Sequence, residues 1–182
     1  MKLSPLGKSE YAFVAYLKGL AERENRGALA ALRRGLGMPP GACTEMHRYV
    51  VPFLREDSWT WREQCRYIIA ALFGLYPAST SAGNFGHTMK LVHEKAGGDS
   101  IERRFIALLK SHRDDLFDHL RQAVSLAKSK DAPVHWERLL EDIQHWDEES
   151  AWVQRSWAQA FWGAGDAAAQ ENTEPSAMGE ER

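Results

Sequence analysis

Seven histidines raise the question of a metal site. Two histidines on one helix hold a metal together when they stand four residues apart, as in the His-Glu-x-x-His motif. No pair in this chain has that spacing. His87 and His93 are six residues apart and have no cluster of cysteines or carboxylates beside them. We therefore expect histidines with structural or solvent-facing roles, with no bound metal and no cofactor.

One short segment is similar to a catalytic loop. Residues 112–116 read His-Arg-Asp-Asp-Leu, close to the His-Arg-Asp-Leu of protein kinases. That loop needs an asparagine five residues after its aspartate and a glycine-rich phosphate loop elsewhere, but position 119 is His119 and no Gly-x-Gly-x-x-Gly occurs. Asp114 and Asp115 are better explained as a helix N-cap. With no Walker motif and no nucleophile elbow, we expect no catalytic residues and no enzyme.

The strongest pattern is a cationic helix face within residues 101–113. At about 100° per residue, four cations fall on one side, with only Glu102 at its edge: Arg103, Arg104, Lys110 and Arg113. The opposite side is an expected core stripe: Ile101, Phe105, Leu108 and His112. We expect the cationic side to face a polyanion.

Further cations lie in three other expected helices: Arg26, Arg33 and Arg34, then Arg62 and Arg66, then Arg121 and Lys128. Arginine forks suit phosphate oxygens, and cations spaced along a groove follow a nucleic-acid backbone without reading bases. No helix-turn-helix or zinc finger is visible, so the expected contacts are with phosphates.

Helices must position these side chains. Apolar residues recur at helical spacing almost throughout, and the alternation typical of strands is missing. The expected helices cover about 10–23, 25–36, 44–51, 58–76, 84–97, 101–112, 114–128 and 134–146, with a last one over about 150–162. Ser58, Asn84 and Asp99 or Ser100 are expected caps. The predicted fold is all-α, with two small helical bundles packed together, an N-terminal lobe (1–97) and a C-terminal lobe (98–163), divided at Gly97-Gly98.

The net charge of −2 hides an asymmetry. Residues 1–165 carry 22 lysines and arginines against 20 acids, whereas residues 166–182 carry one arginine against five acids. We expect residues 164–182 to form a disordered acidic tail, since they show no apolar periodicity. The absence of a signal-peptide pattern and of any long apolar stretch predicts a cytoplasmic protein without a membrane partner. Cys43 and Cys65 are expected as buried thiols rather than a disulfide.

Seven tryptophans could stack on bases or pack in a core. Helical spacing favours packing for Trp136, Trp146 and Trp157. For Trp59 and Trp61, near the start of a helix, both roles stay open.

Three blocks of the sequence resemble the CasB small-subunit family of the type I-E CRISPR Cascade complex. The first is NRGALAALRRGLG at 25–37 with HRYVVPF at 47–53, and the second runs from ERRF at 102–105 to Leu120-Arg121. The third runs from Lys130 through WERLL at 136–140 to 161–162, and its Arg138 is a further expected nucleic-acid contact. The resemblance covers about residues 10–162 and depends on the order of the blocks.

The resemblance implies a non-catalytic subunit that binds nucleic acid and stabilises the R-loop by holding the displaced non-target DNA strand. It implies three kinds of partner: other Cascade subunits, a second copy of the chain, and nucleic acid, including the crRNA backbone. Arg33, Arg34, Arg103, Arg104 and Arg121 match basic positions of the family, and Lys110 and Arg113 stand where its members tend to carry cations. The chain departs from the pattern at Gln122 and at the acids of residues 147–149, and we expect no nucleic-acid contact at the turn that carries those acids.

Two other functions fit the cationic helices. A helical scaffold or adaptor would use them to bind acidic protein partners. A sequence-specific DNA-binding protein would need a recognition helix with side chains for base edges, and none is visible.

The composition of the tail gives a first prediction. Deleting residues 166–182 should leave the thermal unfolding temperature almost unchanged, because the segment offers no core residues. Circular dichroism of the full and truncated chains measures this, and a drop of several degrees would contradict it.

Overall fold

Each segment with helical spacing of apolar residues forms a helix in the computed structural model, which describes residues 5–54 and 59–163. The helices are α1 (Pro5–Glu22), α2 (Arg26–Arg33), η1 (Thr44–Met46), α3 (His47–Val50), η2 (Val51–Phe53), α4 (Trp61–Leu75), α5 (Phe85–Ala96), α6 (Asp99–Lys110), α7 (Arg113–Ser129), α8 (Trp136–Gln144) and α9 (Trp152–Trp162). Within the described ranges the only β-type pairing is an isolated bridge between Ser79 and Val134. The all-α prediction is confirmed, and no described helix is both long and apolar enough to span a membrane.

Several helix boundaries differ from the prediction for local reasons. Asn84 caps α5 as expected, accepting a hydrogen bond from the amide of Gly86. α4 is capped by Thr60 in a reciprocal capping box with Glu63, and the expected cap Ser58 lies outside the described residues. Asp99 and Ser100 lie inside the first turn of α6, after the cap position Gly98, rather than capping it.

The expected cap of α7 is also wrong. His112 occupies the cap position, and its Nδ1 accepts from the amide of Asp114 at 3.5 Å. Asp114 and Asp115 lie in the first turn, where a carboxylate favours the positive end of the helix dipole. Because α6 ends at Lys110, His112 leaves the expected core stripe and is exposed.

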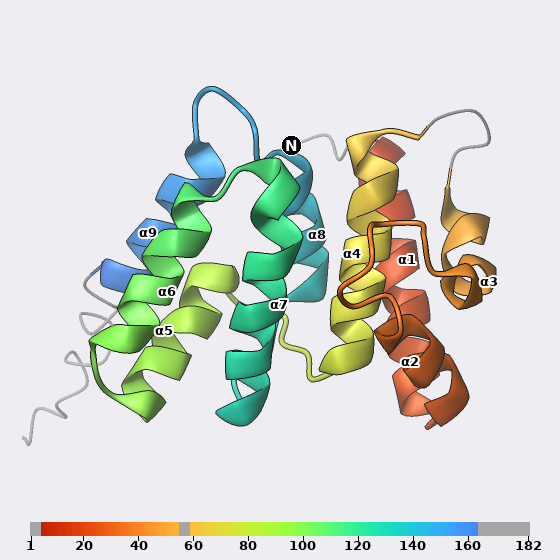
Figure 1. The fold of residues 1–182 in the computed structure, drawn as a ribbon, viewed down its shortest axis with the longest axis horizontal. Coiled ribbons are helices and arrows are strands. Elements are labelled where there is room, and N and C mark those ends of the chain that lie inside the picture. The colour runs from red at the N-terminus through yellow and green to blue at the C-terminus, as the bar shows by residue number, and fades with distance from the viewer. Residues whose placement is uncertain (1–4, 55–58, 164–182) are drawn as a thin grey trace, which may run out of the picture.

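The helices form two groups that meet along α4, α7 and α8 (Figure 1). α2 packs on α4, α8 contacts both α1 and α4, and α7 also contacts α4. α5 packs against α6, α7 and α9, on the far side of α7 from α4. The division at Gly97-Gly98 stays a prediction, and the packing of α5 favours a division in the preceding loop at 76–84.

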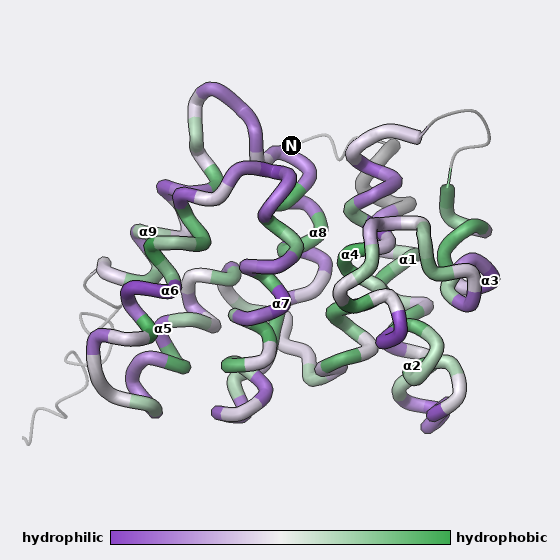
Figure 2. Tube along the Cα trace, in the orientation of Figure 1, coloured by the Kyte–Doolittle hydropathy of each residue, from purple (hydrophilic) through white to green (hydrophobic). Residues whose placement is uncertain are grey.

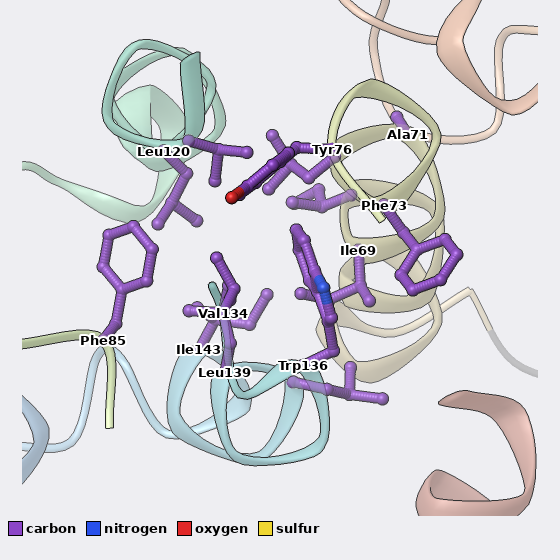
Figure 3. Close-up of a cluster of buried hydrophobic side chains, with 14 of the residues drawn as sticks. Ile69, Ala71, Phe73, Tyr76, Phe85, Leu120, Val134, Trp136, Leu139 and Ile143 are labelled. Carbon is purple, nitrogen blue, oxygen red and sulfur yellow. The ribbon is translucent and has the colours of Figure 1, made fainter. Parts of the chain in front are cut away.

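The helices are amphipathic, with hydrophobic and hydrophilic residues alternating along each trace (Figure 2). Their apolar sides meet around Trp136, where α4 contributes Ile69 and Phe73 and α7 contributes Leu120 (Figure 3). The Trp136 ring lies edge-on to Phe73 with centroids 5.5 Å apart. Packing of Trp136, Trp146 and Trp157 is confirmed, because none is more than 2% exposed.

Polar contacts accompany this apolar seam. The indole nitrogen of Trp136 donates to the carbonyl of Ala78 at 3.2 Å, and that of Trp61 donates to the carbonyl of Ile143 at 2.8 Å. Lys18 of α1 forms an ion pair with Glu137 of α8 at 2.6 Å. Buried indole N–H groups are costly without an acceptor, so these bonds select the observed docking of α8.

One carboxylate is buried in the C-terminal helices. Asp142 is 0% exposed, and it accepts hydrogen bonds from the Trp157 indole at 2.6 Å and from Arg138 Nε at 2.8 Å. Burial raises the pKa of Asp142, and the Trp157 bond and the Arg138 charge offset this effect only in part. The carboxylate is tolerated because both oxygens are satisfied.

Asp142→Ala should lower the free energy of unfolding by about 3 kcal/mol, because it leaves the Trp157 N–H unpaired in the core. Asp142→Asn should cost less, since its amide oxygen still accepts from Trp157. Chemical denaturation compares the variants, and equal losses would contradict this role of the Trp157 bond.

The raised pKa also predicts a pH dependence. Ionised Asp142 costs stability at neutral pH, and this cost disappears as the pH falls through the folded-state pKa towards the reference value of 3.8. The unfolding temperature of the wild type relative to Asp142→Asn should therefore rise from about pH 7 to about pH 4. A difference that does not change with pH would contradict the burial of a charged carboxylate.

Candidate nucleic-acid interface

The predicted cations fall into two groups, those engaged by acids and those left at the surface. Six are exposed and have no ion pair with any described residue: Arg26, Arg33, Arg103, Arg104, Lys110 and Lys128. Exposed cations without an ion-pair partner can neutralise phosphates. The remaining predicted cations each have an acidic neighbour.

Arg66 does not belong to a surface for nucleic acid, and that prediction is corrected. It is 4% exposed and lies 3.5 Å from Glu63, which is 2% exposed. Burial lowers the pKa of its guanidinium, an effect that Glu63 opposes. Arg62, one turn earlier, pairs with Glu10 of α1 at 3.0 Å. Arg62 thus links α4 to α1, whereas Arg66 pairs within α4, and the two do not form an exposed cationic pair.

Arg138 and Arg113 are also engaged within the protein. Arg138 is the counter-ion of Asp142, and its guanidinium lies 5.7 Å from the ring centre of Trp152. Arg113 pairs with Asp147 at 3.2 Å and lies 5.2 Å from the ring centre of Trp61. Arg113 therefore joins α7, α4 and the turn before α9, and it does not share the exposed face of α6.

The predicted face of α6 is otherwise present. Ile101, Phe105 and Leu108 are buried, while Arg103, Arg104 and Lys110 are exposed. The sequence pattern predicted the apolar and cationic sides of α6 correctly, because residues three and four apart share a helix face.

The arginines that end α2 are brought close to α4 by a glycine. A Cβ atom at Gly74 would lie 2.8 Å from the backbone nitrogen of Arg33, closer than real contacts allow. α2 therefore packs directly on the last turns of α4. Arg33 is exposed, and Arg34 pairs with Glu45 at 3.2 Å, with both side chains more than half exposed. Such a solvent-exposed pair contributes little and leaves Arg34 free to exchange partners.

A hollow of about 490 Å³ lies between the two groups of helices, and we call it the interlobe slot. Its lining combines leucines, small polar side chains and two arginines: Leu36, Leu75, Leu126, Gln122, Ser125, Ser129, Arg104 and Arg121. The slot brings together Arg104 of α6 and Arg121 of α7. No acidic residue is part of its lining.

Gly37 supports the position of Arg121. It has a φ of 79°, which L side chains rarely adopt, and a Cβ there would lie 3.1 Å from Arg121 Nη1. The guanidinium thus lies over the loop that follows α2. Its ion pair with Asp118 is long, at 3.5 Å, and 41% of the Arg121 side chain is exposed, so the charge remains available.

Sequence reasoning missed the slot itself. Leu36 and Gly37 stand where the expected helix over 25–36 ends, and Leu75 and Leu126 carried no signal beyond amphipathic spacing. Only folding places these residues beside Arg104 and Arg121, because they come from distant parts of the chain.

Other reactive groups are few in the part of the chain that the structure describes. Cys43 and Cys65 are buried free thiols, as predicted, and burial raises the pKa of both. A thiol with a raised pKa is a poor nucleophile and metal ligand at neutral pH. No group of three or more histidine, cysteine or acidic side chains in residues 5–54 and 59–163 could hold a metal ion.

Trp59 and Trp61, for which the sequence left both base stacking and core packing open, differ in their exposure. Trp59 is 55% exposed and lies with its ring edge towards Tyr67, at 5.7 Å between centroids. Trp61 is half-buried between α8 and Arg113, so packing is its role in this structure.

Stability should separate the two groups of arginines. Arg66→Ala should lower the free energy of unfolding by about 3 kcal/mol or more, because it leaves Glu63 buried without a cation. Arg103→Ala should change it by less than about 0.5 kcal/mol, since the side chain is exposed on a helix that alanine favours. Urea denaturation tests both, and similar effects would contradict this assignment.

Known proteins show the same fold and sequence pattern. Residues 28–162 match the family model of the CRISPR-associated protein Cse2. A CRISPR-associated protein Cse2 of Thermus thermophilus is 37% identical over 156 residues, covering 84% of this chain and 89% of that protein.

Solved structures agree. A crystal structure of a Cse2-family protein from Thermus thermophilus superposes with a TM-score of 0.75 at 32% identity, covering 89% of this chain and all of that one. A chain from a CRISPR RNA-guided surveillance complex superposes with a TM-score of 0.73 at 25% identity, covering 85% of this chain and 92% of that one. With the family model spanning α2 to α9, the chain belongs to the Cse2 family of CRISPR-associated proteins, also named CasB.

Proposed function

We propose that the chain is the small subunit of an RNA-guided surveillance complex and stabilises the R-loop by holding the displaced non-target DNA strand. The observation that carries the proposal is the set of uncompensated cations on α2, α6 and α7. Arg33, Arg103 and Arg104 are exposed without an ion pair to any described residue, and Arg104 and Arg121 border a slot without acids. The similarity to a chain of a CRISPR RNA-guided surveillance complex supports membership of such an assembly.

The energetics fit this role. Replacing a DNA duplex by an RNA–DNA hybrid is nearly balanced in free energy, so a few contacts to the released strand shift the equilibrium. Each arginine that neutralises a phosphate releases counterions and binds without regard to sequence. No catalytic group is required.

The acids of the turn before α9 limit where DNA lies. Asp147 holds Arg113, while Glu148 accepts hydrogen bonds from the Trp152 indole and contacts His145. This end of the molecule is unsuited to a strand of phosphates. The path that we propose instead follows α2, the interlobe slot and α6.

The partners that we propose are the displaced strand, other subunits of the complex and a second copy of the chain, with the crRNA backbone as a further polyanion. Exposed apolar side chains offer surfaces for protein partners, and three of them lie in or beside the segment between α2 and α4: Met38, Val51 and Trp59. They lie on the N-terminal group of helices.

Arg103→Ala/Arg104→Ala should leave assembly of the complex intact, because the displaced strand exists only after the target duplex opens. Losing two phosphate contacts, at roughly 1 kcal/mol each, should shorten the lifetime of the R-loop by ~10-fold or more. Dissociation of target DNA at matched salt measures this. The matched control is Arg48→Ala/Arg155→Ala, which removes the same charge from exposed positions outside α2, α6 and α7.

Unchanged dissociation with normal assembly would show that these arginines do not hold DNA. Failed assembly would instead favour the adaptor function, in which the cationic face binds an acidic protein surface or the crRNA.

The binding of nucleic acid should depend strongly on salt and only slightly on sequence. On single strands the slope of log K against log salt should be about −0.7 per neutralised phosphate, and on duplex DNA about −0.9. Titrations at several salt concentrations measure the slope. A salt-independent affinity, or a strong preference for one sequence, would refute phosphate binding.

A further inference from the structure

We infer that the interlobe slot takes one unstacked base of the bound single strand, while Arg104 and Arg121 hold the phosphates on either side of it. The inference rests on the proposed function and adds where the strand is gripped. The protein would then distinguish a single strand from a duplex, whose bases are stacked and paired.

The volume and lining of the slot suit a base. Its volume of about 490 Å³ falls in the range of small-ligand sites, roughly 300–1,000 Å³. Leu36, Leu75 and Leu126 supply apolar surface from three separate elements. A planar base that leaves its stack exposes two apolar faces, and burying them against leucines is favourable for any of the four bases.

The polar part of the lining suits the rest of a nucleotide. Gln122, Ser125 and Ser129 stand on successive turns of α7. The two serine hydroxyls donate to backbone carbonyls of α7 and can accept from the edge of a base, while the Gln122 amide can both donate and accept. Arg104 has no ion pair with a described residue, and Arg121 has only the long contact to Asp118. Two available guanidinium groups at an apolar slot match a base flanked by phosphates better than an apolar peptide segment.

A neighbouring hollow differs from the interlobe slot in the charge of its lining. It has a volume of about 350 Å³ and lies between the loop at 37–40, α4 and the start of α7. Its lining includes Asp114 and Asp118, and its one arginine, Arg113, already pairs with Asp147. Charge complementarity to a nucleotide is therefore present in the interlobe slot and missing next to it.

Two oligonucleotides with the same number of phosphates test the inference, one of thymidines and one of abasic sites. Their affinities for the full chain are measured by competition at low and moderate salt. The thymidine strand should bind about fivefold or more tightly. Both should show the same salt slope, because the phosphate contacts are shared.

A variant whose side chain fills the slot provides a second test of the inference. Ser125→Phe places a large side chain in the lining at an exposed position, and Ser81→Phe is the control in an exposed loop outside it. Ser125→Phe should lower the affinity for thymidines to that for the abasic strand and leave the abasic affinity unchanged. Ser81→Phe should change neither.

The outcomes separate the two claims. Equal, salt-dependent binding of both oligonucleotides to the wild type would overturn the base slot and leave phosphate binding standing. Absence of salt-dependent binding to either strand would overturn the proposed function together with the slot. If Ser125→Phe fails to fold, 2-aminopurine in the strand replaces it: emission unaltered on binding to the wild type would overturn the inference.

Discussion

The packing of α8 against α1 and α4 is the contact on which the rest of the structure depends. It inserts Trp136 beside Phe73, and the Trp136 and Trp61 indoles reach carbonyls across the seam. The Lys18–Glu137 ion pair closes its edge. These directional bonds fix how the two groups of helices meet, whereas apolar burial alone would permit several arrangements. The position of α7 beside α4, and with it the interlobe slot, follows from this docking.

Arginine has two opposite uses in this fold. Arg66 and Arg138 compensate the carboxylates of Glu63 and Asp142, which folding removes from water. Such buried charges are tolerated only because each has its partner. On α2, α6 and α7 the exposed arginines do not pair with buried acids, so their charge remains available to a polyanion. We propose that the displaced DNA strand is that polyanion.

Much of the fold was predictable because amphipathic spacing is a local property. The stripe of Ile101, Phe105 and Leu108 and the exposed side of α6 follow directly from it. The fate of each arginine was less predictable. The i,i+4 spacing of Arg62 and Arg66 fits two exposed cations as well as two cations paired with acids. The positions of Glu10 and Glu63 in the folded chain decide between these arrangements. The slot was beyond prediction because its lining comes from α4, α6, α7 and the loop after α2.

Site-specific photocrosslinking in the assembled complex tests the central claim most directly. A benzophenone side chain replaces Ser129, an exposed residue of the slot lining, and in a control it replaces Ser150 in the acidic turn. The account predicts that position 129 crosslinks to the non-target DNA strand, that it does so only after the target duplex is added, and that position 150 gives no DNA crosslink. Crosslinking of position 129 to a protein subunit or to the crRNA before target DNA is present would contradict it.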